Sequence, residues 1–237
     1  FYNSTVVAGT GGHFFIKDGV HWRKDTAATR LAAGRNINYS SRHFFVGDNG
    51  LIMKADSVGL THSNGERIKW RVIPSGTTKN LYSVMANSGA TYLAVGEDGI
   101  ILKTTNFGET WNIVPSPVTE DLYSVWMGYG YLIGGANGTI LRCYEPTFTK
   151  WYKQTTPTTE DIYQVMTLGY AEYISMGRNG IFLRTNDGGG SLKRFIGTSV
   201  IEGFYNPSSN LMIPDTISVT VRSSTAPFNI IATSKGS

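Results

Sequence analysis

The sequence predicts an all-β fold, a β-propeller of about five four-stranded blades with a period of about 40 residues. The first observation is a pair of glycines three residues apart, as at Gly96 and Gly99 in VGEDG. The pair recurs in four other copies, at Gly9 and Gly12, Gly47 and Gly50, Gly135 and Gly138, and Gly177 and Gly180. The first glycines are therefore 38, 49, 39 and 42 residues apart. The second observation is that short strand-like runs separate the pairs, and repeats of this length and content are typical of propeller blades.

The copy between residues 81 and 115 shows the four strands of one blade. LYSVM (81–85) and TYLAVG (91–96) are rich in aromatic and β-branched residues and are bounded by turn formers, which is typical of strands. GEDG then forms a tight connection, because glycine accepts the positive φ that such turns require. IILKT (100–104) is the third strand. WNIVP (111–115), after a turn at NFGET, is the fourth, and four antiparallel strands make a propeller blade.

Taken in order, the copies divide the chain into five repeats and a tail. The first repeat lacks its first strand, and the second carries a polar insertion, residues 55–69, that should project from the ring. In the tail, Val200 to Tyr205 is the candidate for the missing strand, so we expect a ring that N- and C-terminal strands close together. The expected boundaries are 1–29, 30–76, 77–116, 117–156 and 157–196 for the repeats, and 197–237 for the closing strand and a β-rich tail.

An aromatic residue closes each copy. The set is Trp22, Trp70, Trp111 and Trp151, with Phe195 in that place in the last copy. A large aromatic side chain at a repeated position fills a repeated gap, so we expect these residues to pack between blades. The glycines are interpreted as turn geometry and not as a phosphate cradle, because no helix follows them.

Composition excludes several classes of function. Charged residues make up 16% of the 237 residues, and the net charge of +4 comes from lysines and arginines that are scattered and not clustered, so no nucleic-acid groove is indicated. No apolar run reaches the roughly 20 residues of a membrane span. The single cysteine, Cys143, excludes an internal disulfide and is expected to be a buried small hydrophobe on a third strand.

The turn before Trp111 resembles a known motif. Thr104, Asn106, Gly108, Thr110 and Trp111 follow the pattern S/T-x-D-x-G-x-T-W of the Asp-box, with Asn in place of Asp. A second, partial match has Thr185, Asp187, Gly189 and Ser191. With AVGxxGxIlkT, residues 1–196 resemble the propellers of the photosystem II stability and assembly factor type, whose repeats also occur in sialidases, other glycosidases and bacteriophage virion proteins. The resemblance implies that Asn106, Gly108, Trp111, Asp187 and Gly189 are structural turn residues, since a short acceptor side chain bonds the backbone of its own turn.

No catalytic residue, cofactor site or metal site is predicted. Arg71–Pro74 is similar to the sialidase F-R-I-P but lies on an outer fourth strand, after the tryptophan. The acidic pairs Glu120–Asp121 and Glu160–Asp161 occupy the same place in two repeats, which favours a structural or solvated role over a glycosidase pair. The four histidines lack metal-binding spacing.

If the propeller binds a partner, the loop residues that differ between copies are the candidates, because folding explains the shared ones. These residues are Asp48, Asn49, His62, Arg67, Glu97, Asp98, Arg178 and Asn179.

Three functions remain open. Low charge, abundant small polar residues and tyrosine, absent disulfides and a β-rich tail favour a non-catalytic structural or interaction propeller in a bacteriophage virion, as a tail, baseplate or adsorption component at the virion surface. The alternatives are a photosystem II assembly factor in an extracytoplasmic compartment (thylakoid lumen or periplasm), which predicts a targeting segment and a basic patch, and a glycan-binding or sialidase-like propeller. The expected partners are other protein subunits of an assembly, with surface glycan as a further possibility.

Overall fold

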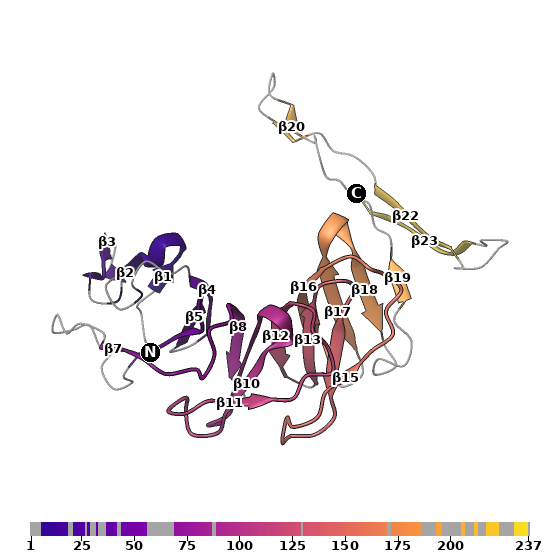
Figure 1. The fold of residues 1–237 in the computed structure, drawn as a ribbon. Helices are drawn as coiled ribbons and strands as arrows, with labels where there is room; N and C mark the ends of the chain where they lie inside the picture. The colour runs from indigo at the N-terminus through magenta and orange to yellow at the C-terminus, as the bar shows by residue number, and fades with distance from the viewer. Residues whose placement is uncertain are drawn as a thin grey trace.

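The chain forms a series of antiparallel sheets that follow one another along an arc (Figure 1). The structure is a computed structural model. It describes residues 6–18, 21–26, 28, 32, 37–41, 44–55, 69–86, 89–128, 130–169, 172–185, 193–195, 205–206, 211–212, 217–222 and 230–236. The all-β propeller class predicted from the glycine period is confirmed.

Four of the sheets have four strands each, connected as simple meanders. They are β4 (Ile37–Ser41), β5 (Phe44–Gly47), β6 (Leu51–Ala55) and β7 (Trp70–Val72); β8 (Leu81–Ala86), β9 (Tyr92–Gly96), β10 (Ile101–Thr104) and β11 (Asn112–Val114); β12 (Leu122–Met127), β13 (Tyr131–Gly135), β14 (Ile140–Cys143) and β15 (Tyr152–Lys153); and β16 (Ile162–Thr167), β17 (Tyr173–Gly177), β18 (Phe182–Thr185) and β19 (Lys193–Phe195). Each lies within one predicted repeat. The first strands β4, β8, β12 and β16 lie beside one another and form the inner edge of the arc.

The remaining strands form smaller sheets. β1 (Val6–Ala8), β2 (Phe14–Asp18) and β3 (His21–Lys24) make a three-stranded sheet, and the tail contains two hairpins, β20 (Tyr205–Asn206) with β21 (Leu211–Met212) and β22 (Ile217–Arg222) with β23 (Ile230–Gly236). Among the described strands, those of the tail pair only with one another and not with β1–β3. Val200 to Phe204 lie outside the described residues, so the closing blade and the division into five repeats stay predictions.

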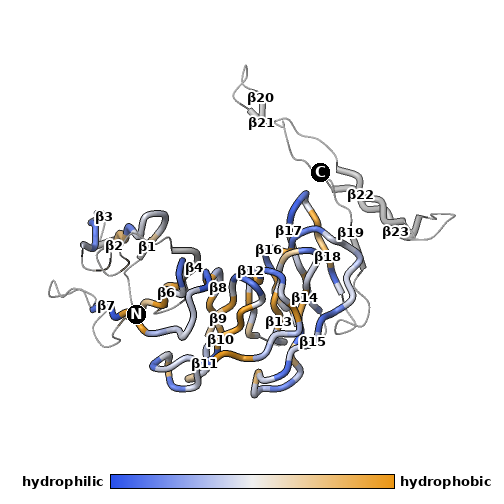
Figure 2. The backbone as a smooth tube through the Cα atoms, in the orientation of Figure 1, coloured by the Kyte–Doolittle hydropathy of each residue, from blue (hydrophilic) through white to orange (hydrophobic). Residues whose placement is uncertain are grey.

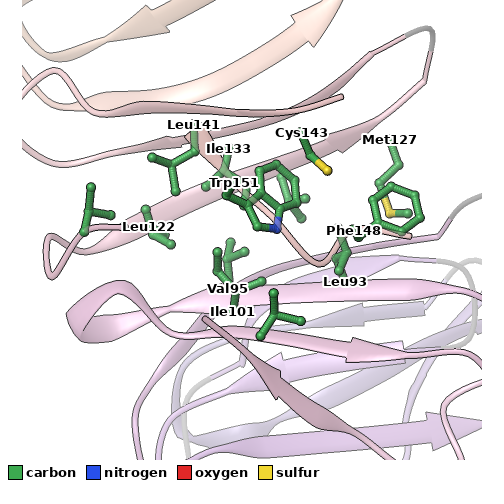
Figure 3. Packing of buried hydrophobic residues seen from close by; sticks show 13 residues of the cluster. Leu93, Val95, Ile101, Leu122, Met127, Ile133, Leu141, Cys143, Phe148 and Trp151 are labelled. Carbon is green, nitrogen blue, oxygen red and sulfur yellow. The ribbon is translucent and has the colours of Figure 1, made fainter. Parts of the chain in front are cut away.

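The core lies between consecutive sheets, because buried apolar residues of neighbouring sheets form shared clusters. Figure 2 shows hydrophobic stretches along the strands of these sheets. We call the face turned toward the preceding sheet the front face and the face turned toward the following sheet the back face. In β8–β11, Leu102 and Trp111 lie on the front face, and Leu93, Val95 and Ile101 on the back face. The back face packs on the next sheet in a cluster around Leu122, Ile133, Leu141, Phe148 and Trp151 (Figure 3). Such burial of whole sheet faces is the dominant stabilising contribution.

The GxxG turns at 96–99 and 135–138 are each held against two neighbouring segments, which explains why both glycines recur there. In VGEDG, a Cβ on Gly96 would lie 1.9 Å from the Asn80 carbonyl oxygen, in the segment that leads into the same blade. Gly99 has φ +70°, and its Cβ would lie 2.2 Å from the Val118 carbonyl oxygen, in the segment that leads into the next blade. The second glycines therefore bring successive blades together as well as turning the chain.

Two features differ from the sequence-based expectation. Trp70, Trp111 and Trp151 are buried between sheets as predicted, but Trp22 is 50% exposed because no described sheet lies against the front face of β1–β3. Residues 26, 28 and 32 are helical, which the repeat pattern did not predict, and the buried Asp25 accepts hydrogen bonds there from the Ala28 amide (3.0 Å) and the Trp70 indole (3.1 Å).

Candidate functional site

One end of the sheets gathers most of the predicted loop residues, and we call it the turn face. It consists of the four GxxG turns at 47–50, 96–99, 135–138 and 177–180, and of the lead-in segments that precede β8, β12 and β16. The turns reach the lead-ins through repeated backbone bonds. For example, the amides of Glu97, Ala136 and Arg178 donate to the carbonyls of Asn80, Asp121 and Asp161 at 2.9, 2.8 and 2.8 Å.

The third residue of each turn has positive φ and presents its amide to the next blade. In three turns this amide donates to the side-chain oxygen of an Asn or Asp at the end of the next lead-in: Asn49 to Asn80 (2.9 Å), Asp98 to Asp121 (2.9 Å) and Asn137 to Asp161 (3.2 Å). The repeated Asn80, Asp121 and Asp161 thus join blades. This geometry accords with the structural role predicted for Asp121 and Asp161.

A ladder of three tyrosines runs across the turn face beside these bonds. The ring centroids of Tyr82 and Tyr123 are 5.7 Å apart, and those of Tyr123 and Tyr163 are 5.5 Å apart, with tilted ring planes. Tyr82 and Tyr123 are half-buried and Tyr163 is exposed. The three rings therefore offer one continuous aromatic surface along the inner strands β8, β12 and β16.

Each ladder tyrosine is the extra residue of a β-bulge. The pairing of β8 with β9 skips from Leu81 to Ser83, and β12 and β16 skip at Tyr123 and Tyr163 in the same way. β4 has the same irregularity, with Asn38 as the extra residue. A bulge removes one side chain from the alternation of its strand and re-aims it, and bulges are frequent next to functional sites. The sheets thus turn these tyrosines out of the interblade core.

The ladder lies in an acidic surrounding, although the whole chain has a net charge of +4. The acidic side chains of the turn face are Asp48, Glu97, Asp98, Glu120, Asp121, Glu160 and Asp161, and the basic ones are Lys79 and Arg178, joined by Lys153 from β15, which reaches Glu120. Each basic side chain has an acidic partner: Lys79 pairs with Asp98 (3.4 Å), Lys153 with Glu120 (2.9 Å) and Arg178 with Asp161 (2.9 Å). The acidic groups outnumber the basic ones, so the face carries negative charge at neutral pH.

This charge acts on the tyrosine hydroxyls. Burial raises the pKa of Tyr82, and the carboxylates of Asp121 and Glu97 raise it further. Burial also raises the pKa of Tyr123, with added contributions from Asp161 and Asp121. Tyr163 accepts a hydrogen bond from the Arg178 guanidinium at 3.2 Å. At neutral pH Tyr82 and Tyr123 therefore present neutral phenol rings in a negative field.

The structure brings together six of the eight predicted loop residues. Asp48, Asn49, Glu97, Asp98, Arg178 and Asn179 all lie on the turn face. Several of them also serve the fold, since Glu97 accepts from the Asn80 amide (2.9 Å) and Asn179 donates to Glu160 (3.1 Å). His62 and Arg67, in the insertion, lie outside the described residues. A binding role for the six stays a prediction.

The turn that resembles an Asp-box is held by Asn106. Its side-chain oxygen accepts from the Thr110 amide (3.1 Å) and the Thr104 hydroxyl (2.8 Å), and its amide group donates to the Thr110 hydroxyl (2.9 Å). Gly108 has φ +78° and lies against the Phe44 ring of the preceding blade, where a Cβ would come within 2.2 Å. These contacts hold Asn106 and Gly108 in place, and Trp111 after the turn is buried. Their role as structural turn residues stays a prediction. Asp187 and Gly189 of the partial second match lie outside the described residues.

Arg71 and Cys143, two other residues of functional types, have structural partners. Arg71, from the sialidase-like tetrapeptide, lies on the fourth strand β7 and forms an ion pair with Glu109 (2.9 Å). Cys143 is buried on β14, donates to the Glu145 carbonyl (3.2 Å), and has a pKa raised by burial. Within the described part of the chain, no group of three potential metal ligands occurs, and no helix has the length and apolar character needed to cross a membrane.

Sequence reasoning missed the tyrosine ladder. The prediction of a strand at LYSVM (81–85) assigns no separate role to Tyr82. The available signal was a tyrosine at the same place in three copies, 41 and 40 residues apart. A non-aliphatic side chain that repeats at one strand position is a candidate for a surface residue.

Comparisons with known proteins identify the fold. YCF48 from Cyanidioschyzon merolae superposes with a TM-score of 0.56 and 13% sequence identity, over 88% of this chain and 70% of that one. A structure described as YCF48 bound to D1 peptide gives 0.49 and 12%, over 87% and 82%. The GH74 xyloglucanase from Xanthomonas campestris gives 0.41 and 12%, over 82% of this chain and 28% of that one. No protein family and no curated protein matches the sequence. At 13% identity, the likeness to the Cyanidioschyzon protein shows a propeller fold and nothing about activity.

Proposed function

We propose that the chain is a non-catalytic interaction propeller that holds a protein segment on its turn face, and that it serves as a structural component of a bacteriophage virion. The observation that carries the proposal is the ladder of Tyr82, Tyr123 and Tyr163. Its members occupy bulges, while the aliphatic residues of the same strands fill the interblade core. Neither the turns nor the core requires a phenol ring at these positions.

The chemistry of the ladder favours a segment that carries lysine or arginine. Cations are attracted to the faces of tyrosine rings, by about 0.5–2 kcal/mol per contact. The surrounding carboxylates of Asp98, Asp121 and Asp161 add an attraction of the same sign, which raises the rate of encounter and disfavours acidic partners. A peptide with alternating cationic side chains therefore fits this face better than a neutral or acidic one.

The virion setting rests on composition and architecture. The chain is low in charge, lacks an internal disulfide and ends in two β-hairpins without the glycine pair. Such hairpins have strand edges that can pair with another chain. These properties suit a protein that stays in a large assembly, and the test of this part is whether the chain is found in purified particles.

The binding proposal is tested on a peptide array that includes lysine- and arginine-rich, neutral and acidic sequences. Tyr123→Ala removes the central ring of the ladder. The matched control, Tyr144→Ala, removes a tyrosine that is 57% exposed and follows β14 directly, at the end of the sheet opposite the turn face. We expect cationic peptides to bind the wild type and the control, with binding reduced at least tenfold by Tyr123→Ala. Equal binding by both variants, or a preference for acidic peptides, would count against the proposal.

A glycan-binding function is the second candidate, because sugars also stack on tyrosine rings. It differs in its charge requirement, since a neutral sugar can donate hydrogen bonds to the carboxylates around Tyr123 but gains no charge–charge attraction from them. A glycan array read with the same two variants separates the candidates. Binding of neutral oligosaccharides, lost in Tyr123→Ala and insensitive to salt, would replace the peptide proposal.

The photosystem II assembly-factor alternative has the same propeller fold and predicts a basic patch. The turn face carries the opposite charge, so on this alternative the patch has to lie elsewhere on the molecule. Binding of the chain to isolated photosystem II subunits, compared with binding to phage structural proteins, distinguishes the two settings.

A further inference from the structure

The two end sheets of the array leave apolar blade faces exposed that every other sheet buries. On the front face of β1–β3, Phe15 is 42% exposed, whereas the residues at its register position in the other sheets have 0% exposure: Met53, Leu102, Leu141 and Leu183. Trp22 is 50% exposed, whereas Trp70, Trp111 and Trp151 are at most 9% exposed. This front face is thus built like the others and lacks a described sheet against it.

The back face of β16–β19 shows the complementary pattern. Met176 is 39% exposed, and its equivalents Val46 and Val95 have 0% exposure. Ile174 and Phe182 on the same face are only half-buried, although their equivalents in the preceding sheets, Leu132 and Ile140, are 3% and 4% exposed. Apolar residues thus occupy positions that the described part of the chain does not fully cover.

The GxxG turn of this last sheet is open in the same way. The second glycines of three turns approach a carbonyl of the next lead-in, so that a Cβ on Gly50, Gly99 or Gly138 would lie 2.0, 2.2 or 2.0 Å from it. Gly180 has the same backbone conformation, with φ +69°, and nothing lies within 4 Å of its Cβ position. Among the described residues, the turn at Gly180 therefore has the conformation of the turns at Gly50, Gly99 and Gly138 without the contact that they make to a following lead-in.

We infer that the back face of β16–β19 binds the front face of β1–β3 of a second copy of this chain, in a head-to-tail contact. Within the chain, back faces and front faces are already each other's partners at every junction from β1–β3 to β16–β19. The contact between copies continues that interface with the same kinds of residue: Ile174, Met176 and Phe182 from one copy, and Phe15 and Trp22 from the other. β1–β3 and β16–β19 lie at opposite ends of the arc and do not meet within it, so we assign the two faces to different copies (Figure 1). This contact takes the place of the predicted closure of the ring within one chain by Val200 to Tyr205.

A head-to-tail contact has consequences that a symmetric dimer lacks. The two surfaces differ, so each copy retains one free face after the first contact, and assembly proceeds to a closed ring or an open filament. The inference goes beyond the proposed function and is independent of the tyrosine ladder, because the end faces assemble whether or not a segment binds on the turn face.

The test is the mass of the full chain in solution by light scattering, for the wild type and two variants. Trp22→Glu places a charge on the front face and Met176→Glu on the back face, and Ile113→Glu is the control at a residue that is 60% exposed on the outer strand β11. We expect the wild type and the control to exceed the 25.9 kDa of one chain with rising concentration, and each end variant alone to stay at 25.9 kDa.

Mixing the two end variants is the decisive step. Trp22→Glu keeps an intact back face and Met176→Glu an intact front face, so the mixture should form a species of twice the single-chain mass and nothing larger. A monomeric wild type, end variants that keep the wild-type mass, or a mixture without the dimer would each overturn the inference. Phe15→Gln is a milder front-face variant that serves in place of Trp22→Glu if circular dichroism shows the latter to be unfolded.

Discussion

The effect of the close approach between a GxxG turn and the next blade can be isolated by comparing Gly99, which makes this approach, with Gly180, which does not. Gly99 and Gly180 have nearly identical backbone conformations, with φ +70° and +69°. They differ in their surroundings, because a Cβ on Gly99 would lie 2.2 Å from the Val118 carbonyl oxygen and a Cβ on Gly180 would meet nothing within 4 Å. Substitution by alanine therefore adds the same backbone strain at both sites and a steric conflict at only one.

The expected magnitudes follow from these contacts. An alanine held at positive φ costs about 1–2 kcal/mol, and this is the whole effect at Gly180. At Gly99 the lead-in must also move away by more than an ångström, and overpacking of this kind costs about 1–3 kcal/mol. That movement also strains the hydrogen bond from the Asp98 backbone amide to the Asp121 side chain (2.9 Å), which lowers the unfolding free energy by about another 1 kcal/mol. We expect Gly99→Ala to lose about 2–4 kcal/mol more than Gly180→Ala.

Urea unfolding followed by circular dichroism measures this difference. Gly99→Ala should lower the transition midpoint strongly, since 2–4 kcal/mol is a large share of the roughly 5–15 kcal/mol that stabilises a typical domain. Gly180→Ala should lower it slightly. Equal destabilisation by the two variants would refute the reasoning, because the turns would then be required for backbone conformation and not for the contact between blades.

Three further variants probe other parts of the fold. Asn106→Ala removes the acceptor of the Thr110 amide and should reduce the unfolding free energy by about 1–2 kcal/mol in urea titrations, whereas Asn106→Asp keeps the acceptor and should cost less. The hydrogen bonds from Arg71 hold the pKa of Glu109 at about 2, so the stability of the folded protein should fall as the pH drops from about 4.5 toward 2. Thermal melts of Glu109→Gln over the same pH range should show a smaller fall than those of the wild type. Phe148 is buried (1% exposed) and has a backbone φ of +54°. Phe148→Gly therefore relieves about 1 kcal/mol of backbone strain but loses about 3–5 kcal/mol of stabilisation from the buried ring, and calorimetry should show a net loss of stability.

The sequence was most informative where geometry forces one residue type. The steric demands at Gly96 and Gly99 leave no alternative to glycine, so the period of the glycine pair revealed the propeller and the place of its turns. Strand content followed from the same repeat, and β8–β11 lie where the aromatic and β-branched runs of residues 81–115 predicted them.

The candidate site was less predictable, because it depends on strand register. LYSV gives no sign that Tyr82 is the extra residue of a bulge, and the direction of its ring follows from the pairing of Leu81 and Ser83 with β9. Glu97 and Asp98 were predicted only as loop residues. The contacts that tie them to the fold come from Asn80, in the segment that leads into the same blade, and from Asp121, in the segment that leads into the next one.

Burial of a repeated residue also depends on what lies beside its sheet. Trp22 and Trp111 have the same place in the repeat, and the sequence predicts the same packing for both. Trp111 is 8% exposed because the back face of β4–β7 covers it, and Trp22 is 50% exposed. A pattern identifies the face to which a side chain belongs, and only the arrangement of the sheets shows whether that face is covered.

The proposal that a protein segment lies on the turn face inside a virion is tested most directly by photo-crosslinking at the centre of the ladder. A photoreactive phenylalanine analogue replaces Tyr123 in particles assembled with the chain, and the same analogue at Tyr144 serves as the control. We expect a crosslink from position 123 to another virion protein, at a peptide that contains lysine or arginine, and none from position 144. Absence of the chain from the particles, or equal crosslinking from both positions, would contradict the account.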